Sequence, residues 1–191
     1  MKKLKDLVLK NRSYRRYRQD YSVSIGVLRE LIDLARLSPS GGNLQPLKYI
    51  ISSDRKTNNM IFPCLSWAGY IKNWAGPIEG ERPSAYIVVL GGRKIKKTFG
   101  YEAGIACQSI LLGAVEKGLG GCIIGSINRA KLRKALHISK YYEILLVLAI
   151  GKPVEKIKIE KIGSSGDIKY WRDAKGVHHM PKRSLEEIIL C

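Results

Sequence analysis

The segment 101–117 constrains the fold more than any other part of the sequence. Nearly all of its residues are apolar or small, and no charged residue lies between Glu102 and Glu116. This composition predicts a helix that is buried on every side, because a helix with a solvated face carries polar residues along that face. Its small residues would let neighbouring helices approach closely. We therefore expect this helix at the centre of the core or in a subunit interface.

Strands and helices alternate along the rest of the chain. The run 85–90 is almost continuously apolar and β-branched, which is typical of a buried strand. Because few strands are joined by helices, a layered α+β fold is favoured over a doubly wound sheet. Further strands are predicted at 47–52, 118–125 and 142–150, and helices at 3–10, at 25–37 after Ser24, from Asn128 to Leu136 and from Ser184 to Leu190. Residues 54–82, and those between Pro153 and Ser184, are predicted to be irregular.

Length and composition favour one folded domain over residues 1–191. The chain has 191 residues, of which 45% are apolar, so it can bury a core without disulfide bonds. That apolar fraction excludes a disordered basic tail protein. Within the domain, residues 55–82 are interpreted as a lid-like insertion and residues 152–191 as a C-terminal extension.

The charge balance leaves a nucleic-acid-binding function open as a second class. Lys and Arg number 34 and Asp and Glu number 16, so the net charge is +18. Strong positive charge is common in nucleic-acid-binding proteins, and Arg and Tyr also interleave at 12–18. Against this function, the charge is spread along the chain and no known nucleic-acid-binding motif is present.

Cysteine usage and hydropathy indicate the cytoplasm. No apolar run reaches the roughly 18 residues of a membrane span, and residues 1–7 do not resemble a signal peptide. The scattered cysteines are predicted to be free thiols. Since His178 and His179 have no third ligand nearby in sequence, we predict no metal site.

Four segments contain groups that suit one anionic, flat ligand. Arg12, Ser13 and Arg15 offer two guanidinium groups and a hydroxyl, which suit a phosphate or a polarised carbonyl edge. A solvated basic face is the alternative. The glycine-framed strand at 120–125 lets backbone approach a flat ligand closely. In the third segment, Ser40, Gly41, Asn43 and Gln45 supply a hydroxyl, bare backbone and two amides, which suit a planar heterocycle; a well-capped connection between a helix and a strand is the alternative. In the fourth, Lys182 and Arg183 form a second basic pair, for which a solvated surface is the alternative.

The segment 62–74 is unusually aromatic for a region without predicted helices or strands. It either packs on the core of its own chain or forms a lid or pocket wall. Its candidates for a substrate pocket are Phe62, Trp67, Tyr70 and Trp74. Dinucleotide-binding glycine motifs, P-loops, nucleophile elbows and zinc-protease motifs are absent from the sequence.

Together, these segments resemble the nitroreductase family of flavin enzymes. Arg12-Ser13-Tyr14-Arg15 is similar to the family's Arg-Ser-x-Arg motif, and the segment 37–46 is similar to its Pro-Ser-x-x-Asn-x-Gln-Pro signature. Gly118-Leu119-Gly120 and the basic segment 181–188 match two further family features in the expected order. One departure is Asn11, because family members often carry an additional Arg at this position. Arg16 or Arg12 would compensate for the missing Arg.

The resemblance implies an intertwined α/β/α homodimer with one flavin mononucleotide (FMN) at each of two interface sites. Arg12 and Ser13 would lie on the ribityl-phosphate side, Arg15 at the pyrimidine edge, and Lys182 and Arg183 at the phosphate. Tyr14 would be a further cofactor-binding residue. Ile123, Ile124 and Gly125 would face the ring. The partner subunit would contribute Pro39, Ser40, Gly41, Asn43 and Gln45.

The resemblance also implies a ping-pong reaction. NADH or NADPH would reduce the flavin, and a nitroaromatic or quinone acceptor would then take the same place and be reduced. Because the flavin carries this chemistry, no catalytic side chain is expected. Arg15 would stabilise the negative charge of the reduced flavin. Flavin fragmentation and reductive dehalogenation are alternative reactions on the same fold.

Overall fold

A central antiparallel sheet organises the computed structural model, which describes residues 3–190. The sheet contains β2 (Leu47–Ser52), β3 (Ala85–Gly92), β5 (Tyr142–Pro153) and β4 (Gly120–Ile124) in that spatial order. The short strand β1 (Tyr17–Arg18) pairs with the end of β5. Every residue of β3 is buried, as its run of apolar residues predicts.

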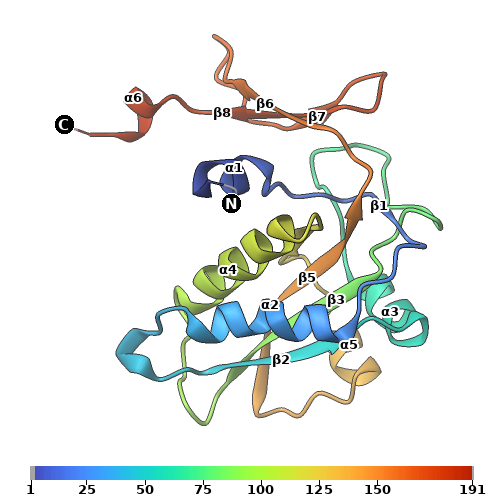
Figure 1. The fold of residues 1–191 in the computed structure, drawn as a ribbon, viewed down its shortest axis with the longest axis vertical. Coiled ribbons are helices and arrows are strands. Elements are labelled where there is room, and N and C mark those ends of the chain that lie inside the picture. The colour runs from blue at the N-terminus through green and yellow to red at the C-terminus, as the bar shows by residue number, and fades with distance from the viewer. Residues whose placement is uncertain (1–2, 191) are drawn as a thin grey trace.

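Helices cover both faces of this sheet, so the predicted layered α+β fold is confirmed. The helices α2 (Ile25–Leu37) and α4 (Glu102–Glu116) pack on one face, against Ile87 and Val89 of β3 (Figure 1). Residues of α3 (Arg55–Ile61) and α5 (Arg129–Ala135) pack on the other face, in a cluster that includes Tyr86, Val88 and Leu90. This division follows from the strand geometry, in which successive side chains point to opposite faces.

Capping side chains begin the helices where the sequence predicts them. Ser24 accepts a hydrogen bond from the Val27 amide at the start of α2, and Asn128 accepts one from Lys131 at the start of α5. At the two ends of the chain lie α1 (Leu4–Lys10) and α6 (Leu185–Ile188), the latter with a capping box at Ser184. The last helix ends before Leu190, so it is shorter than predicted.

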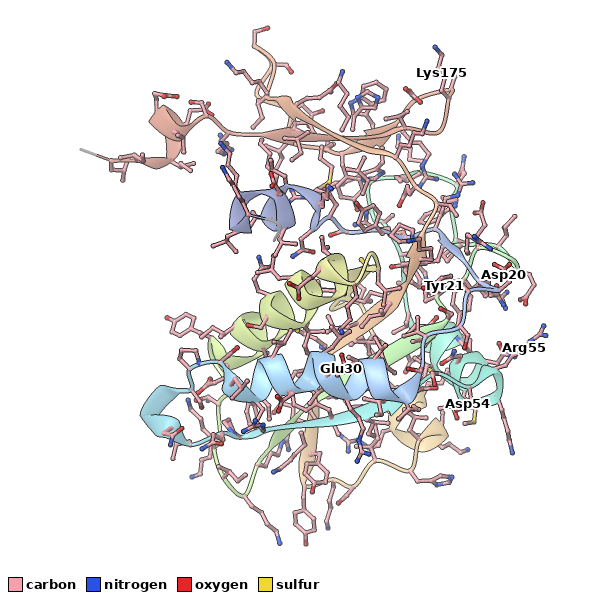
Figure 2. The ribbon with its side chains drawn as sticks, in the orientation of Figure 1. Asp20, Tyr21, Glu30, Asp54, Arg55 and Lys175 are labelled. Atoms are coloured by element: carbon pink, nitrogen blue, oxygen red, sulfur yellow. The ribbon has the colours of Figure 1, made fainter. Side chains whose placement is uncertain are left out.

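The central helix α4 is less buried than predicted. Its middle and C-terminal turns pack on the sheet and on α2, and Lys117 just beyond it forms an ion pair with Glu30 on the outer face of α2 (Figure 2). Ile105 near its N-terminus is 40% exposed. Burial on every side is therefore not achieved within a single chain. Among the described residues, no helix has the length and apolar character that crossing a membrane requires.

The prediction that residues 54–82 are irregular is wrong for their first part. Asp54 caps α3 by accepting a hydrogen bond from the Thr57 amide, 2.8 Å away. Figure 2 shows Asp54 and Arg55 at the start of this helix. A short 3₁₀ turn, η2 (Phe62–Cys64), follows directly. Asn and Thr are weak helix formers, so their presence in α3 obscured the helical signal.

The prediction that the chain is irregular between Pro153 and Ser184 is also wrong. Three strands form a second sheet there, the C-terminal sheet, which lies beyond α1 (Figure 1). In it, β8 (His178–Lys182) pairs in parallel with β6 (Ile157–Lys161) and antiparallel with β7 (Trp171–Arg172). Many charged residues hid the strand pattern. Pro181 is accommodated because β7 pairs only with the first two residues of β8.

Two adjacent histidines of β8 have opposite environments. His179 lies between Glu160 (Nδ1–Oε1 2.8 Å) and Asp173 (Nε2–Oδ2 3.2 Å), and these hydrogen bonds raise its pKa. His178 is fully buried, neither ring nitrogen has a hydrogen-bond partner within residues 3–190, and burial lowers its pKa. The ion pairs of His179 thus stabilise the C-terminal sheet while His179 is protonated and both carboxylates are ionised, and His179 lowers the pKa of Glu160 and of Asp173. Their contribution is complete just below the ordinary histidine pKa, about 6.5, and is lost as the pH rises through the raised pKa of His179. In acid it is lost as the pH falls through the lowered carboxylate pKa values.

We expect an NMR titration of the histidine ring protons to separate these two residues. His179 should titrate above pH about 6.5 and His178 below it, since one is paired with carboxylates and the other is buried. The variant His179→Gln, which cannot titrate, should remove the higher-titrating resonance and serves as its assignment. A His178 that titrates above His179 would contradict the described environments.

We also expect Gly121→Ala to lower the melting temperature. A Cβ at Gly121 in β4 would lie 2.7 Å from the carbonyl oxygen of Ala149, so the backbone has to shift. Such overpacking costs about 1–3 kcal/mol. The control Gly26→Ala, whose Cβ would meet only Ser24 Oγ at 3.6 Å, should leave the melting temperature unchanged or higher. Equal melting temperatures for the two variants would show that β4 tolerates the added methyl group.

Candidate functional site

The N-terminal basic segment lies along the free edge of β4. Ser13 forms a parallel bridge with Gly121, and the Tyr14 amide donates a hydrogen bond to the Gly121 carbonyl, 3.0 Å away. This pairing holds Arg12 and Arg15 beside the strand, each next to a separate pocket. Both pockets are lined in part by Ile123 of β4, whose side chain is 40% exposed. We call the two together the β4 cleft.

The first pocket of the β4 cleft, the Arg12 pocket, brings two cations from opposite ends of the chain together. Its volume is about 210 Å³. It is lined by Asn11, Arg12, Ser13, Gln108, Leu111, Ile123, Met180 and Lys182. None of these residues has a carboxylate, and neither Arg12 nor Lys182 forms an ion pair with another described residue.

The Arg12 side chain is only partly satisfied by its own chain. Its Nη2 donates to the Val8 carbonyl at 2.6 Å, but its Nε is buried and has no partner among the described residues. Burial lowers the pKa of Arg12, although an arginine remains protonated at neutral pH. A partly buried guanidinium beside a lysine, without a neutralising carboxylate, suits a bound anion such as a phosphate.

The second pocket, the Arg15 pocket, has a volume of about 170 Å³. Its lining comprises Arg15, Ser66, Trp67, Ala68, Gly69, Cys122, Ile123, Ile124, Gly125, Ser126 and Tyr170. The Arg15 guanidinium donates to the Ser13 carbonyl (3.1 Å) and lies over the Tyr170 ring, 4.9 Å from its centroid. The cleft therefore offers an anion pocket and, along Ile123–Gly125, a strand edge with a second cation.

The predicted segment 39–45 lies outside the β4 cleft. Pro39, Ser40 and Gln45 line a different pocket of about 280 Å³, together with residues of α2, β2 and α4. Ser40 Oγ accepts a hydrogen bond from the Gln45 amide (3.0 Å), and Gln45 Nε2 donates to Asn43 Oδ1 (3.1 Å). Asn43 and Gln45 have positive φ angles of 53° and 48°, a conformation that costs energy for non-glycine residues. Gly41 begins the 3₁₀ turn η1 (Gly41–Asn43) in the same loop.

Two of the other predicted cofactor residues do not line the cleft. The Tyr14 ring packs beside Gly120, and its hydroxyl donates to the Lys10 carbonyl at 3.0 Å. Arg183 is exposed. By contrast, Arg12, Ser13, Arg15 and Lys182 line it, as do Ile123, Ile124 and Gly125.

The four aromatic candidates occupy different places. Trp67 is buried and lines the Arg15 pocket, whereas Tyr70 packs on Tyr170 with ring centroids 5.0 Å apart. Trp74 lies under Arg172 at 4.9 Å.

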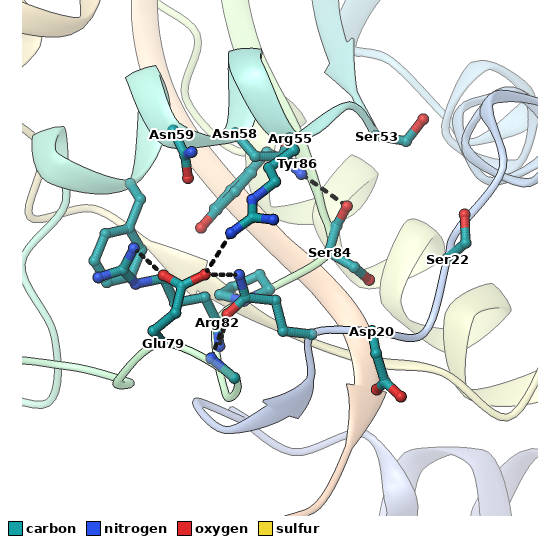
Figure 3. A pocket seen from close by; sticks show the side chains of 14 residues that line it. Asp20, Ser22, Ser53, Arg55, Asn58, Asn59, Glu79, Arg82, Ser84 and Tyr86 are labelled. Atoms are coloured by element: carbon teal, nitrogen blue, oxygen red, sulfur yellow. Dashed lines mark hydrogen bonds and ion pairs between the residues drawn. The ribbon is translucent and has the colours of Figure 1, made fainter.

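Phe62 lies in another pocket altogether. Its ring lies under the Arg82 guanidinium, 4.4 Å away. It lines a pocket of about 410 Å³, in which Figure 3 shows Glu79 between Arg55 and Arg82.

Several lining residues were not predicted from the sequence. Gln108 lies on α4, and its Oε1 accepts a hydrogen bond from Asn11 Nδ2 at 3.1 Å. Met180 and Lys182 lie on the same face of β8, because side chains alternate between the two faces of a strand. Had the strand been recognised, this alternation would have predicted Met180 beside Lys182. Tyr170 stands in a polar segment without periodicity, and no pattern in the sequence marks it.

The comparisons with known proteins agree with this fold. A family model described as Nitroreductase family matches residues 8–74 and 81–152. The putative NAD(P)H nitroreductase YodC of Bacillus subtilis is 26% identical over 186 residues, which cover 78% of this chain and 89% of YodC. A putative NADH dehydrogenase/NAD(P)H nitroreductase of Archaeoglobus fulgidus is also 26% identical, over 78% of this chain and 85% of its own.

Solved structures have the same fold. A nitroreductase family protein from Clostridium difficile 630 superposes with a TM-score of 0.69 at 20% identity, over 99% of this chain and 98% of that protein. An FMN-dependent nitroreductase from Clostridium difficile R20291 has a TM-score of 0.63 at 22% identity, over 78% and 87%. Because the family model covers most of the chain, this protein belongs to the nitroreductase family of oxidoreductases, as its four sequence segments predicted.

Proposed function

We propose that this protein is an FMN-dependent oxidoreductase that uses NAD(P)H to reduce small nitroaromatic or quinone acceptors by a ping-pong mechanism. The observation that carries the proposal is the Arg12 pocket, where Arg12 and Lys182 meet without a carboxylate. A phosphate group would neutralise both. The names of the relatives, NAD(P)H nitroreductases and an FMN-dependent nitroreductase, support the choice of cofactor and reductant.

Each part of the β4 cleft has a role in this proposal. Arg12, Ser13 and Lys182 bind the phosphate by charge-assisted hydrogen bonds. The edge of β4 at Ile123–Gly125 supports the flavin ring, and Arg15 lies at the pyrimidine edge. A bound flavin would supply the redox chemistry, a hydride transfer from NAD(P)H followed by reduction of the acceptor. Trp67 limits the size of the space beside the ring.

We further propose a homodimer in which the segment 39–45 of a second copy completes the cleft. The segment is exposed and strained, and it lines a pocket separate from the β4 cleft. Apolar side chains near it are also exposed, including Leu37 (65%), Leu44 (48%) and Ile105 (40%). A second copy that covers this surface would bury α4 on its remaining side.

We expect the purified protein to show flavin absorption bands, or to quench FMN fluorescence when FMN is added. Lys182→Ala and Arg12→Ala should each weaken FMN binding about 10-fold to 100-fold, since a hydrogen bond to a charged group contributes about 1.5–3 kcal/mol. Lys158→Ala is the matched control, because Lys158 lies in the same C-terminal sheet but pairs with Glu160 (2.9 Å). Titration of FMN fluorescence measures all four dissociation constants.

A wild-type protein without flavin bands and without quenching would refute the proposal. A salt-dependent gel shift with nucleic acid at physiological ionic strength would then favour the alternative class. Where FMN binds, anaerobic turnover with nitroaromatics, quinones and halogenated aromatics distinguishes the proposed reaction from dehalogenation.

Mixing two variants tests whether the site is shared between copies. Arg12→Ala/Lys182→Ala and Asn43→Ala/Gln45→Ala alter the two parts of the proposed site, so each should bind FMN weakly on its own. After the two are mixed and subunits exchange, half of the dimers in a symmetric assembly are hybrids, each with one intact site, so about a quarter of the sites should recover FMN binding. If the mixture binds no more FMN than the separate variants, the segment 39–45 does not complete the cleft of a second copy.

A further inference from the structure

Tyr170 is a cleft residue that the C-terminal sheet supplies. It precedes β7, in a part of the chain that the family model does not match, yet it lines the Arg15 pocket. The C-terminal sheet therefore does more than deliver Lys182 to the Arg12 pocket. It also provides a side chain that contacts the cation at the other end of the cleft.

Three contacts hold the Tyr170 ring in place. The Arg15 guanidinium lies 4.9 Å from the ring centroid. The rings of Tyr70 and His178 lie 5.0 Å and 5.1 Å away, both tilted. Since His178 is fully buried, the ring rests on a packed support. Its orientation is therefore fixed by groups from three separate segments of the chain.

The carboxylate nearest to Arg15 is used by other groups. Glu155 is buried, and its Oε2 accepts a hydrogen bond from the Arg15 backbone amide at 2.8 Å. Its Oε1 pairs with Arg172 at 2.5 Å. Among the described residues, the Arg15 guanidinium forms no ion pair. Its neighbours are the Ser13 carbonyl and the face of Tyr170.

This choice of neighbours matters for a cation that acts on a ligand. A carboxylate would hold the guanidinium but would also cancel most of its field at the pocket. An aromatic face attracts the cation through its quadrupole and adds no net charge. The cation is thus held in one place while its charge stays available to a ligand in the Arg15 pocket.

We propose that Tyr170 is a positioning residue that holds Arg15 at the pyrimidine edge of the bound flavin and thereby raises the reduction potential of the flavin. This inference rests on the proposed function. Reduction adds negative charge near Arg15, so a fixed cation favours the reduced flavin over the oxidised one. Without the ring, Arg15 moves among several positions and stabilises the reduced flavin less.

The test measures the two-electron midpoint potential of bound FMN against reference dyes under anaerobic conditions. Tyr170→Leu, which removes the ring, should bind reduced FMN about threefold to tenfold more weakly relative to oxidised FMN. That is a fall of about 15–30 mV, since a tenfold change corresponds to about 30 mV for two electrons. Tyr170→Phe keeps the aromatic face and should retain the wild-type potential.

A double-mutant cycle shows whether Tyr170 acts through Arg15. Arg15→Ala alone should lower the potential, and adding Tyr170→Leu to it should cause no further fall. Tyr141→Leu is the matched control, because Lys94 lies 4.5 Å from the centroid of this ring, and neither residue lines the β4 cleft. An unchanged potential in Tyr170→Leu, or an equal fall with and without Arg15, would overturn the inference.

A second measurement keeps this test separate from the proposed function. The NMR resonances of the Arg15 side chain in the flavin-free protein should be shifted by the ring current of Tyr170 and should move in Tyr170→Leu. If the wild type binds no FMN, the proposed function fails and the inference fails with it, whatever the ring current shows. If FMN binds normally but the Arg15 resonances do not move in Tyr170→Leu, only the inference is overturned.

Discussion

The pairing of the N-terminal segment with the edge of β4 is the interaction on which the candidate site depends. The bridge between Ser13 and Gly121 aligns this segment with the strand, so that Arg12 and Arg15 lie at separate pockets along it. The pairing also covers a sheet edge that would otherwise present free backbone groups. It requires a glycine, since a side chain at Gly121 would collide with the backbone of the neighbouring strand. The same contact therefore closes the sheet and assembles the site.

The candidate site is indicated by cations that lack a nearby carboxylate and not by the net charge of the chain. The net charge of +18 suggested a nucleic-acid partner, yet many cations pair with carboxylates, as Arg16 does with Glu81 and Arg172 with Glu155. Among the described residues, Arg12 and Lys182 form no ion pair, and they share a pocket without an acidic residue. The Arg15 guanidinium likewise forms no ion pair with a described residue and lies against an aromatic ring. The β4 cleft therefore gathers three cations that no carboxylate of the described chain neutralises.

Local patterns and ordered motifs predicted much of this structure, and non-local pairing explains what they missed. The strand 47–52 and the cap at Ser24 follow from neighbouring residues, so the sequence shows them directly. The sequence could predict that Arg12 and Lys182 serve one site, because both lie in segments that resemble those of the nitroreductase family. The C-terminal sheet was missed because β6 pairs in parallel with a strand some 20 residues away, which no local pattern encodes. Tyr170 was missed for the same reason, since only the fold places it beside Arg15.

The C-terminal sheet differs physically from the core that carries it. Its buried groups include Glu155, His178 and His179, whereas the two clusters on the central sheet are almost wholly apolar. A sheet held by ion pairs and ring contacts depends on pH and salt far more than an apolar core does. It nevertheless supplies both Lys182 and Tyr170 to the cleft. In the proposed function, binding at the two ends of the cleft is therefore coupled to this less apolar part of the fold, and substitutions there would adjust the site without disturbing the core.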